Sequence, residues 1–221
     1  MGQIQGVLLD VDGTLVLSND DHARAWVTAF AEHGYDVPFD RVRPLLGMGG
    51  DKVLDKVTPG LSDKEGPGKA IGERRKAIVL EQYAPHIAPS LGARDLVQRM
   101  QGAGLRVIVA TSAKPDELEA MLKAAGVDGL LRERTTSDDA KESKPAPDIV
   151  SVALQRIGLS AEQVLMIGDS PYDIEAAAKI GVSTVAVRCG GFSDDDLKDA
   201  HAIYDDPADL VAHYDESPLS A

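Results

Sequence analysis

The chain is poor in cysteine, in aromatic residues and in long apolar runs. Its one cysteine, Cys189, excludes an intrachain disulfide and any metal site built from several thiolates. Aromatic residues make up 4% of the sequence and all hydrophobic residues 43%, so the core must consist mainly of aliphatic side chains. No apolar run approaches the ~18 residues of a membrane span, and no basic segment leads into an apolar stretch near the first residue. We therefore expect no membrane partner and a cytoplasmic location.

Basic residues are scarce relative to acidic ones. Lys and Arg number 23, whereas Asp and Glu number 36, which gives a net charge of -13. An acidic surface disfavours nucleic acids and anionic membranes as partners. An anionic small molecule would need a local positive charge, from a metal ion or a lysine, in order to bind.

Apolar stretches alternate with helical patterns along most of the chain. The stretches predict buried strands at Gly6–Val11, Leu105–Thr111, Thr135–Thr136, Gln163–Gly168 and Ser183–Arg188. The patterns between them predict helices at Leu91–Gly104, Pro115–Ala125, Asp148–Ile157 and Pro171–Ile180. This alternation predicts an α/β fold, a doubly wound, Rossmann-like parallel sheet that binds ligands beyond the carboxyl ends of its strands.

The alternation is interrupted directly after the first strand. Residues 17–85 contain no convincing strand, and their patterns predict helices at Asn19–Gly34, Phe39–Leu46, Lys52–Val57 and Lys69–Tyr83. We therefore predict a core domain of residues 1–16 and 86–221 and a small helical domain of residues 17–85. The basic cluster Arg74–Lys76 is interpreted as a solvated helix face, and the tail from Ser217 is expected to fray.

The first strand delivers two carboxylates and then stops at a glycine. Side chains alternate along a strand, so Asp10 and Asp12 are expected to point to the same side and to repel each other. A buried strand end rarely tolerates such a pair unless a cation or a reaction uses it. Gly13 lets the backbone turn sharply and leaves amides free to face an anion.

Three further places carry residues suited to phosphate chemistry. Thr111 closes the second strand, and Lys144 precedes a Pro-Ala-Pro-Asp segment that keeps its backbone extended. Asp169 follows the fourth strand, with Asp173 four residues later. Together with Asp10-Val11-Asp12-Gly13-Thr14, these motifs resemble, in order, those of the haloacid dehalogenase-like superfamily. The resemblance is in particular to the phosphatases of that superfamily that have a helical cap inserted after the first strand, and it covers almost the whole chain.

The resemblance implies a phosphoryl-transfer role for four of these residues. Asp10 is expected to attack phosphorus and form an aspartyl phosphate. Asp12 is expected to protonate the leaving oxygen and then to activate water. Thr111, with the amide of Ser112, is expected to hold phosphoryl oxygens, and Lys144 to neutralise the phosphate and the nucleophile together.

The resemblance also implies Mg²⁺ as the cofactor. Its expected ligands are Asp10, the backbone carbonyl of Asp12 and Asp169, because a small hard cation prefers oxygen donors. Asp173 is expected to bind the metal directly or through water, to orient the lysine, or only to favour the N-terminus of its helix.

The predicted helical domain extends the resemblance to β-phosphoglucomutase-like members. His22 and Trp26 occupy positions that a histidine and a tryptophan hold in those relatives. His22 is expected to assist Asp12 or to contact the leaving group.

A glycine-rich loop in the same domain is the candidate for substrate selection. It spans Leu46–Lys52, with Gly49 and Lys52 as expected substrate contacts. Gly50 stands where the mutase-like relatives carry an arginine for a distal phosphate, and this departure weighs against a mutase.

The sequence favours one function among four. The first is a Mg²⁺-dependent phosphatase of a small organic phosphomonoester, phosphoglycolate-like or sugar-phosphate-like, acting as a monomer or homodimer. The alternative is a β-phosphoglucomutase-like sugar phosphomutase. A dehalogenase would use neither Asp12 nor Asp169, and a non-catalytic binding module is expected to have lost motif residues, all of which are present here.

Overall fold

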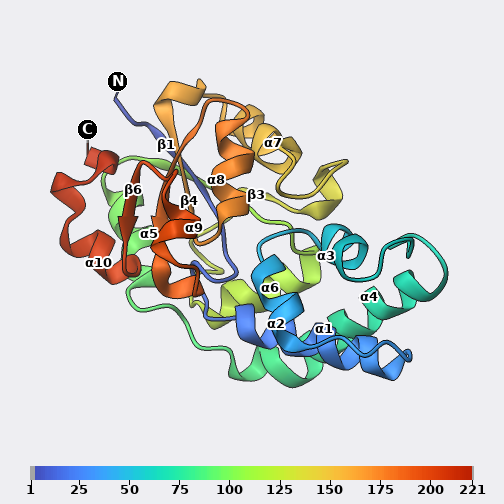
Figure 1. Cartoon of the computed structure of the whole chain (residues 1–221). Coiled ribbons are helices and arrows are strands. Elements are labelled where there is room, and N and C mark those ends of the chain that lie inside the picture. The colour runs from blue at the N-terminus through green and yellow to red at the C-terminus, as the bar shows by residue number, and fades with distance from the viewer. Residues whose placement is uncertain (1–2, 221) are drawn as a thin grey trace.

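The computed structural model describes residues 3–220. At its centre lies a parallel sheet of six strands in the order β3-β2-β1-β4-β5-β6 (Figure 1). The strands are β1 (Gly6–Leu9), β2 (Arg106–Ala110), β3 (Arg134–Thr135), β4 (Val164–Gly168), β5 (Ser183–Val187) and β6 (Ala202–Tyr204). The predicted doubly wound α/β fold is therefore confirmed. The sequence did not predict β6, because three half-buried residues give too short a pattern.

Helices cover both faces of this sheet. In β1, Val7 and Leu9 join one apolar cluster and Leu8 the other, since successive strand side chains point to opposite faces. The first cluster includes residues of α5 and α6, and the second includes residues of α7 and α8. The bounds are α5 (Ala93–Gly102), α6 (Pro115–Ala124), α7 (Asp148–Ile157), α8 (Pro171–Ala178), α9 (Asp194–Leu197) and α10 (Pro207–Ala212).

Residues 17–85, called the helical insert from here on, contain no strand. Their helices are α1 (Asn19–Glu32), α2 (Phe39–Val42), α3 (Gly50–Val57) and α4 (Gly66–Ile78), followed by η2 (Val79–Tyr83). Shorter turns are η1 (Arg43–Leu45), η3 (Ala84–His86), η4 (Ser137–Asp139), η5 (Ala161–Gln163), η6 (Arg188–Gly190), η7 (Tyr214–Glu216) and η8 (Pro218–Ser220). In Figure 1 the helices of the insert lie together beside the sheet-containing part of the chain. The start of α4 precedes the predicted one by three residues, because Pro67 is well suited to a first helical turn.

The C-terminal tail is ordered by its own contacts, so the expected fraying from Ser217 is wrong. Ser217 and Leu219 are both buried, and Ser217 Oγ donates to the backbone oxygen of Tyr214 at 2.6 Å. The polar side chain thus closes a local turn while Leu219 joins the main apolar cluster.

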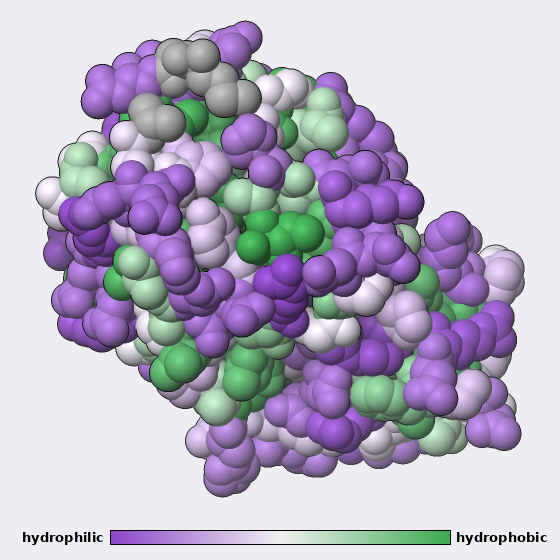
Figure 2. All heavy atoms as spheres, turned by 60° about the vertical axis from the view of Figure 1, so that its left-hand side comes forward, coloured by the Kyte–Doolittle hydropathy of each residue, from purple (hydrophilic) through white to green (hydrophobic). Residues whose placement is uncertain are grey.

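The exterior carries mostly polar residues on the face that Figure 2 shows, with hydrophobic residues in small separate groups. No helix of residues 3–220 is both long enough and apolar enough to cross a membrane.

Candidate active site

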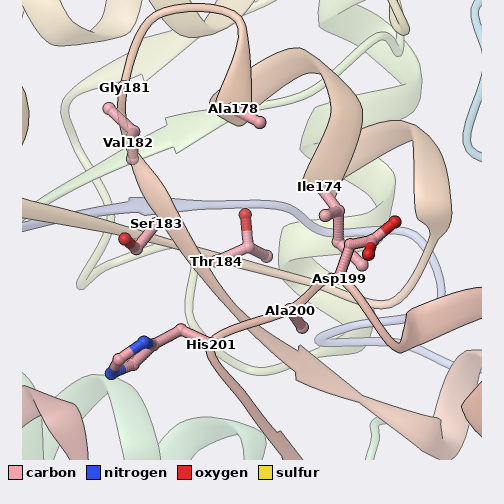
Figure 3. Close-up of a pocket in the computed structure, with 9 residues that line it drawn as sticks. All are labelled: Ile174, Ala178, Gly181, Val182, Ser183, Thr184, Asp199, Ala200 and His201. Atoms are coloured by element: carbon pink, nitrogen blue, oxygen red, sulfur yellow. The ribbon is translucent and has the colours of Figure 1, made fainter.

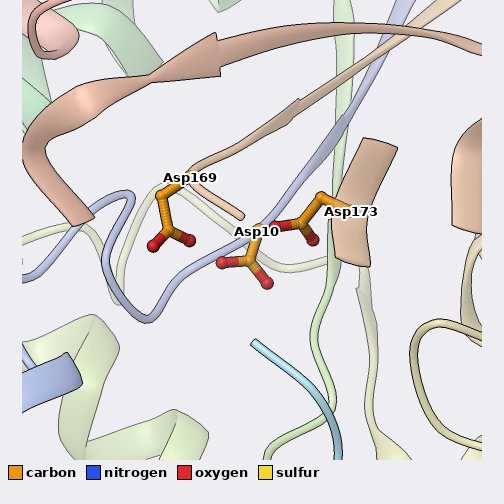
Figure 4. A group of neighbouring side chains, drawn as sticks. All are labelled: Asp10, Asp169 and Asp173. Atoms are coloured by element: carbon orange, nitrogen blue, oxygen red, sulfur yellow. The ribbon is translucent and has the colours of Figure 1, made fainter. Parts of the chain in front are cut away.

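Three buried carboxylates meet at the carboxyl edge of the sheet. Asp10 directly follows β1, Asp169 directly follows β4, and Asp173 lies in the first turn of α8. One oxygen from each lies within 4.8 Å of the others, and Figure 4 shows the three side chains converging. Parallel pairing of β1 with β4 produces this approach, since it places the ends of the two strands side by side.

The start of α8 fixes the orientation of Asp173. Ser170 is the N-cap, and its Oγ donates to Asp173 Oδ2 at 2.6 Å while accepting from the backbone N of Asp173 at 3.3 Å. This reciprocal arrangement satisfies helix donors that would otherwise be unpaired. It leaves Asp173 Oδ1 facing Lys144 and the other carboxylates.

Lys144 places a single ammonium between two of the three acids. Its Nζ donates to Asp10 Oδ1 at 2.6 Å and to Asp173 Oδ1 at 2.7 Å, and its side chain is 1% exposed. Burial opposes the charged form, but the charges of Asp10 and Asp173 outweigh it and raise the pKa of Lys144. The lysine is therefore a fixed positive charge inside the cluster.

One lysine leaves this cluster with excess negative charge. Burial, with the charge of Asp173 added to it and Lys144 opposing, raises the pKa of Asp10 to about 7. Burial and the charges of Asp173 and Asp10 also hold the pKa of Asp169 well above its usual range. Buried carboxylate oxygens in this surplus are the donor set that suits a hard divalent cation such as Mg²⁺. Asp10, Asp169 and Asp173 are the residues that could hold it.

Asp12 faces a different set of partners. Its Oδ1 accepts from Ser18 Oγ at 2.6 Å and lies 2.8 Å from His22 Nε2, so its side chain is not part of the carboxylate cluster. Although burial opposes ionisation, the charge and hydrogen bonds of His22 and Ser18 lower the pKa of Asp12 to about 2. The structure thus joins two predicted site residues, Asp12 and His22, across the boundary between core and insert.

The turn after Asp12 requires glycine for two reasons. Gly13 has a φ of +78°, in the left-handed region, and a Cβ there would lie 2.2 Å from Asp169 Oδ2. The turn also brings Thr14 Oγ1 to donate to Asp10 Oδ2 at 3.2 Å. Thr14 was not among the predicted site residues, although it stands within the quoted motif.

A second residue absent from the prediction is Asn19, which begins α1. Its Nδ2 donates to Asp169 Oδ2 at 2.7 Å and to the backbone oxygen of Gly190 at 3.0 Å. In the sequence Asn19 is only the first residue of a predicted helix, and the contact with Asp169 spans 150 residues. No local pattern could have revealed it.

Thr111 and Ser112 lie at the end of β2, at the same edge of the sheet. The Thr111 side chain accepts a hydrogen bond from the backbone N of Ala113 at 3.1 Å and so stabilises its own turn. Ser112 Oγ is buried and has no hydrogen-bond partner within residues 3–220. Neither hydroxyl donates a hydrogen bond within residues 3–220, and Ser112 Oγ also accepts none.

The glycine-rich loop of the insert rests on the segment that carries Lys144. Gly49 N donates to the backbone oxygen of Lys144 at 3.4 Å, and a Cβ on Gly49 would lie 2.1 Å from Ser143 Cβ. Lys52 pairs with Glu142 and does not reach the carboxylates. The structure thus brings Gly49 to the site and directs Lys52 elsewhere.

The basic cluster on α4 is not a uniformly solvated face, so that interpretation is wrong for one member. Arg75 pairs with Glu117 of α6, with exposed side-chain fractions of 16% and 3%, and lies over the Trp26 ring at 5.3 Å from its centroid. Arg74 pairs with Glu32 and Lys76 with Asp116 nearer the surface.

An open surface pocket of about 520 Å³ lies elsewhere on the sheet-containing part of the chain (Figure 3). It is lined in part by Ser183 and Thr184, at the amino end of β5, and by His201. The carboxylates stand at the opposite end of the parallel strands, so this pocket does not belong to their site.

Comparison with known proteins agrees with this geometry. Residues 7–187 match the family model described as haloacid dehalogenase-like hydrolase. The chain is 36% identical over 202 residues to the protein SUPPRESSOR OF QUENCHING 1, chloroplastic, of Arabidopsis thaliana. That match covers 90% of this chain but 19% of the plant protein. This chain is also 27% identical to a phosphoglycolate phosphatase of Mannheimia succiniciproducens, over 95% of this chain and 97% of that protein.

A solved structure has the same fold. The crystal structure of a hydrolase from Pseudomonas syringae superposes with a TM-score of 0.89 at 28% identity, covering 96% of this chain and 98% of that one. The family match spans the helical insert and the sheet as far as β5, including every motif residue from Asp10 to Asp173. The chain therefore belongs to the haloacid dehalogenase-like hydrolase family, as the sequence motifs predicted, and is an enzyme of that family.

Proposed function

We propose that the chain is a Mg²⁺-dependent phosphatase that hydrolyses a small organic phosphomonoester through an aspartyl phosphate. The observation that carries this proposal is the buried cluster in which Lys144 joins Asp10 to Asp173 while Asp12 is held apart by His22. A nucleophile beside a fixed cation, and a second carboxylate in its own proton-sharing pair, are what phosphoryl transfer from an ester requires. Relatives named as phosphatases support the same reaction class.

In the first step Asp10 attacks phosphorus. The new bond joins an Asp10 oxygen to phosphorus, and the bond between phosphorus and the ester oxygen breaks. Lys144 Nζ and Thr14 Oγ1 each contact one Asp10 oxygen and orient the carboxylate. Mg²⁺, when bound, would neutralise charge on the phosphoryl oxygens. The Ser112 hydroxyl, which lacks a partner in residues 3–220, is available to donate to the phosphate, with Thr111 shaping its turn.

Asp12 transfers a proton in each of the two steps. A proton shared with His22, 2.8 Å away, passes to the departing ester oxygen as its bond to phosphorus breaks. In the second step Asp12 takes a proton from water, which attacks phosphorus and releases inorganic phosphate from Asp10. Because Asp12 is placed by Ser18 and His22, both in the insert, proton transfer depends on the insert being closed over the core.

The helical insert, residues 17–85, is proposed to be a cap domain that selects the substrate and excludes water, on a core of residues 1–16 and 86–221. His22 and Gly49 touch the core at the site itself. Lys52 would reach a substrate only by exchanging its pairing with Glu142. We propose small phosphate esters as the only substrates, the cytoplasm as the compartment, and a monomer or homodimer as the working form.

The test is release of inorganic phosphate from p-nitrophenyl phosphate and from a panel of phosphorylated metabolites. Asp10→Asn is expected to lower kcat by about 10³-fold or more without unfolding the chain. The exposed Asp128→Asn, which removes the same charge far from any site contact, should retain activity. EDTA should abolish turnover and Mg²⁺ restore it. Phosphate release by Asp10→Asn at the wild-type rate would exclude the proposed nucleophile.

The mutase alternative predicts a different product. The His22–Asp12 contact serves either reaction, but a mutase must hold a second phosphate. Incubation with β-glucose 1-phosphate distinguishes the two functions, because a mutase yields glucose 6-phosphate whereas a phosphatase yields glucose and phosphate.

A further inference from the structure

Cations that bridge the insert and the core are all neutralised within residues 3–220. The structure describes five basic residues with a contact across this boundary, and each also contacts a carboxylate. They are Arg43 with Asp20, Lys52 with Glu142, Arg75 with Glu117, Lys76 with Asp116, and Lys144 with Asp10 and Asp173. A substrate in the closed site would therefore meet no unpaired positive charge from these five residues, unless its phosphoryl group displaced one of the carboxylates.

Outside the carboxylate cluster, the most buried of these pairs is Arg75 with Glu117, with exposed side-chain fractions of 16% and 3%. Arg75 lies over the ring of Trp26, which stands one helical turn from His22, and His22 contacts Asp12. The Arg75 charge also contributes to lowering the pKa of Asp12. Arg75 thus lies within electrostatic reach of the group that would protonate the leaving oxygen.

The same pair retains one unused polar group. Arg75 Nε is buried and has no hydrogen-bond partner within residues 3–220. Glu117 cancels the guanidinium charge but does not occupy this N–H, so what the pair offers a neighbouring ligand is a hydrogen-bond donor with little net charge. A hydroxyl suits such a donor. A carboxylate or second phosphate gains from Arg75 but is repelled by Glu117, a carboxylate that is only 3% exposed and therefore poorly screened.

We propose that Glu117, by neutralising Arg75, makes this phosphatase select esters whose leaving group is an uncharged alcohol or polyol over esters that carry a second anionic group. This inference rests on the proposed function and specifies the substrate class of that same site. Arg75 and Glu117 are specificity-determining residues, and the phosphoryl-transfer residues are common to both substrate classes. Phosphoglycolate, whose leaving group is a carboxylate-bearing alcohol, falls in the disfavoured class.

The test compares two esters that differ at one carbon. Glycerol 3-phosphate carries a terminal hydroxymethyl group where 3-phosphoglycerate carries a carboxylate. Each is measured as a substrate by phosphate release, and as a competitor of p-nitrophenyl phosphate hydrolysis, so that a value is obtained even for a slow substrate. Wild type is expected to favour glycerol 3-phosphate in both measures.

Glu117→Gln keeps a side chain that can accept from Arg75 but removes the cancelling charge. The preference is expected to shift by about tenfold or more toward 3-phosphoglycerate, since a unit charge a few ångströms away has at least that effect at an effective dielectric constant of about 20. Asp116→Asn is the matched control. It removes the same charge from the adjacent residue, whose partner is the more exposed Lys76, and should leave the preference unchanged.

Two more variants test the proposal if Glu117→Gln does not fold. Arg75→Gln leaves Glu117 unopposed, so the preference should shift further toward glycerol 3-phosphate. The double variant Arg75→Gln/Glu117→Gln should return to the wild-type ratio. A pair that only fastens the insert to the core would change the rates on both esters together and leave their ratio constant, and that result would overturn the proposal, as would a wild-type preference for 3-phosphoglycerate.

Failure of the proposed function has a separate signature. If wild type does not hydrolyse p-nitrophenyl phosphate with Mg²⁺, the phosphatase assignment is wrong. If it hydrolyses that ester but the ratio does not respond to Glu117→Gln, only the specificity inference is wrong.

Discussion

Replacing Lys144 by methionine should destabilise the metal-free protein far more than its single charge suggests. The ammonium is 1% exposed and contacts two carboxylates at 2.6 and 2.7 Å. At an effective dielectric constant of about 20, each contact supplies about 6 kcal/mol of attraction, against several kcal/mol of desolvation per ion. Methionine fills similar space without charge, so Asp10, Asp169 and Asp173 would be left as uncompensated buried acids. Breaking a buried pair in this way costs about 3–5 kcal/mol.

Urea unfolding in EDTA measures this cost directly, because no metal can then replace the lost charge. Lys141→Met is the control, since Lys141 is exposed, lies three residues earlier and should change the free energy of unfolding by less than about 0.5 kcal/mol. Mg²⁺ should recover part of the loss in Lys144→Met, because a bound divalent cation supplies charge to the same carboxylates. A loss below about 1 kcal/mol in EDTA would refute the view that Lys144 holds the cluster together.

Two further predictions concern neighbours of the site. Gly13→Ala should lower the free energy of unfolding by about 2 kcal/mol or more, because strain at φ +78° adds to a clash with Asp169. In contrast, Gly60→Ala, at φ +94° with nothing nearby, should show the strain alone, and equal losses for the two would disprove the clash. Burial raises the pKa of the Cys189 thiol to about 12, so iodoacetamide at pH 8 should modify it slowly in the folded protein and rapidly in urea. Mass spectrometry measures the extent of modification, and rapid modification of the folded protein would contradict the burial of the thiol.

The fold could be predicted from local patterns because both faces of the sheet are buried. The strands β1 and β4 are fully buried and read as continuous apolar runs, and glycine follows most of the helices between them. Strands with few or half-buried residues give weaker patterns, which is why the prediction for β3 is displaced by one residue and β6 was missed. The positions of the carboxylates at strand ends followed from the same reasoning, since parallel strands end at one edge.

Contacts between distant segments could not be predicted in this way. Asn19 donates to Asp169 across 150 residues, and Arg75 pairs with Glu117 across 42. In sequence, Asn19 is indistinguishable from a helix cap and Arg75 from any arginine of a solvated helix. Only the packing of the insert against the core decides which polar residue of a helix becomes buried, and that packing depends on the whole chain.

Asp10 and Asp12 lie in distinct environments and are not chiefly the repelling pair that strand alternation predicts. Alternation along a strand made them a repelling pair, but β1 ends at Leu9, and Asp12 lies in the turn beyond it. Asp10 is affected chiefly by burial, Lys144 and Asp173, and Asp12 is the weakest of the influences that raise its pKa. Asp12 is instead held ionised by His22 and Ser18. Burial disfavours the anion that Asp10 needs as the proposed nucleophile, and a bound divalent cation would favour that anion. The lowered pKa of Asp12 suits the base of the second step, so the proton for the leaving oxygen must come from the pair that Asp12 forms with His22. The turn at Gly13 separates the two acids, so one strand end can supply both the proposed nucleophile and the proposed proton carrier.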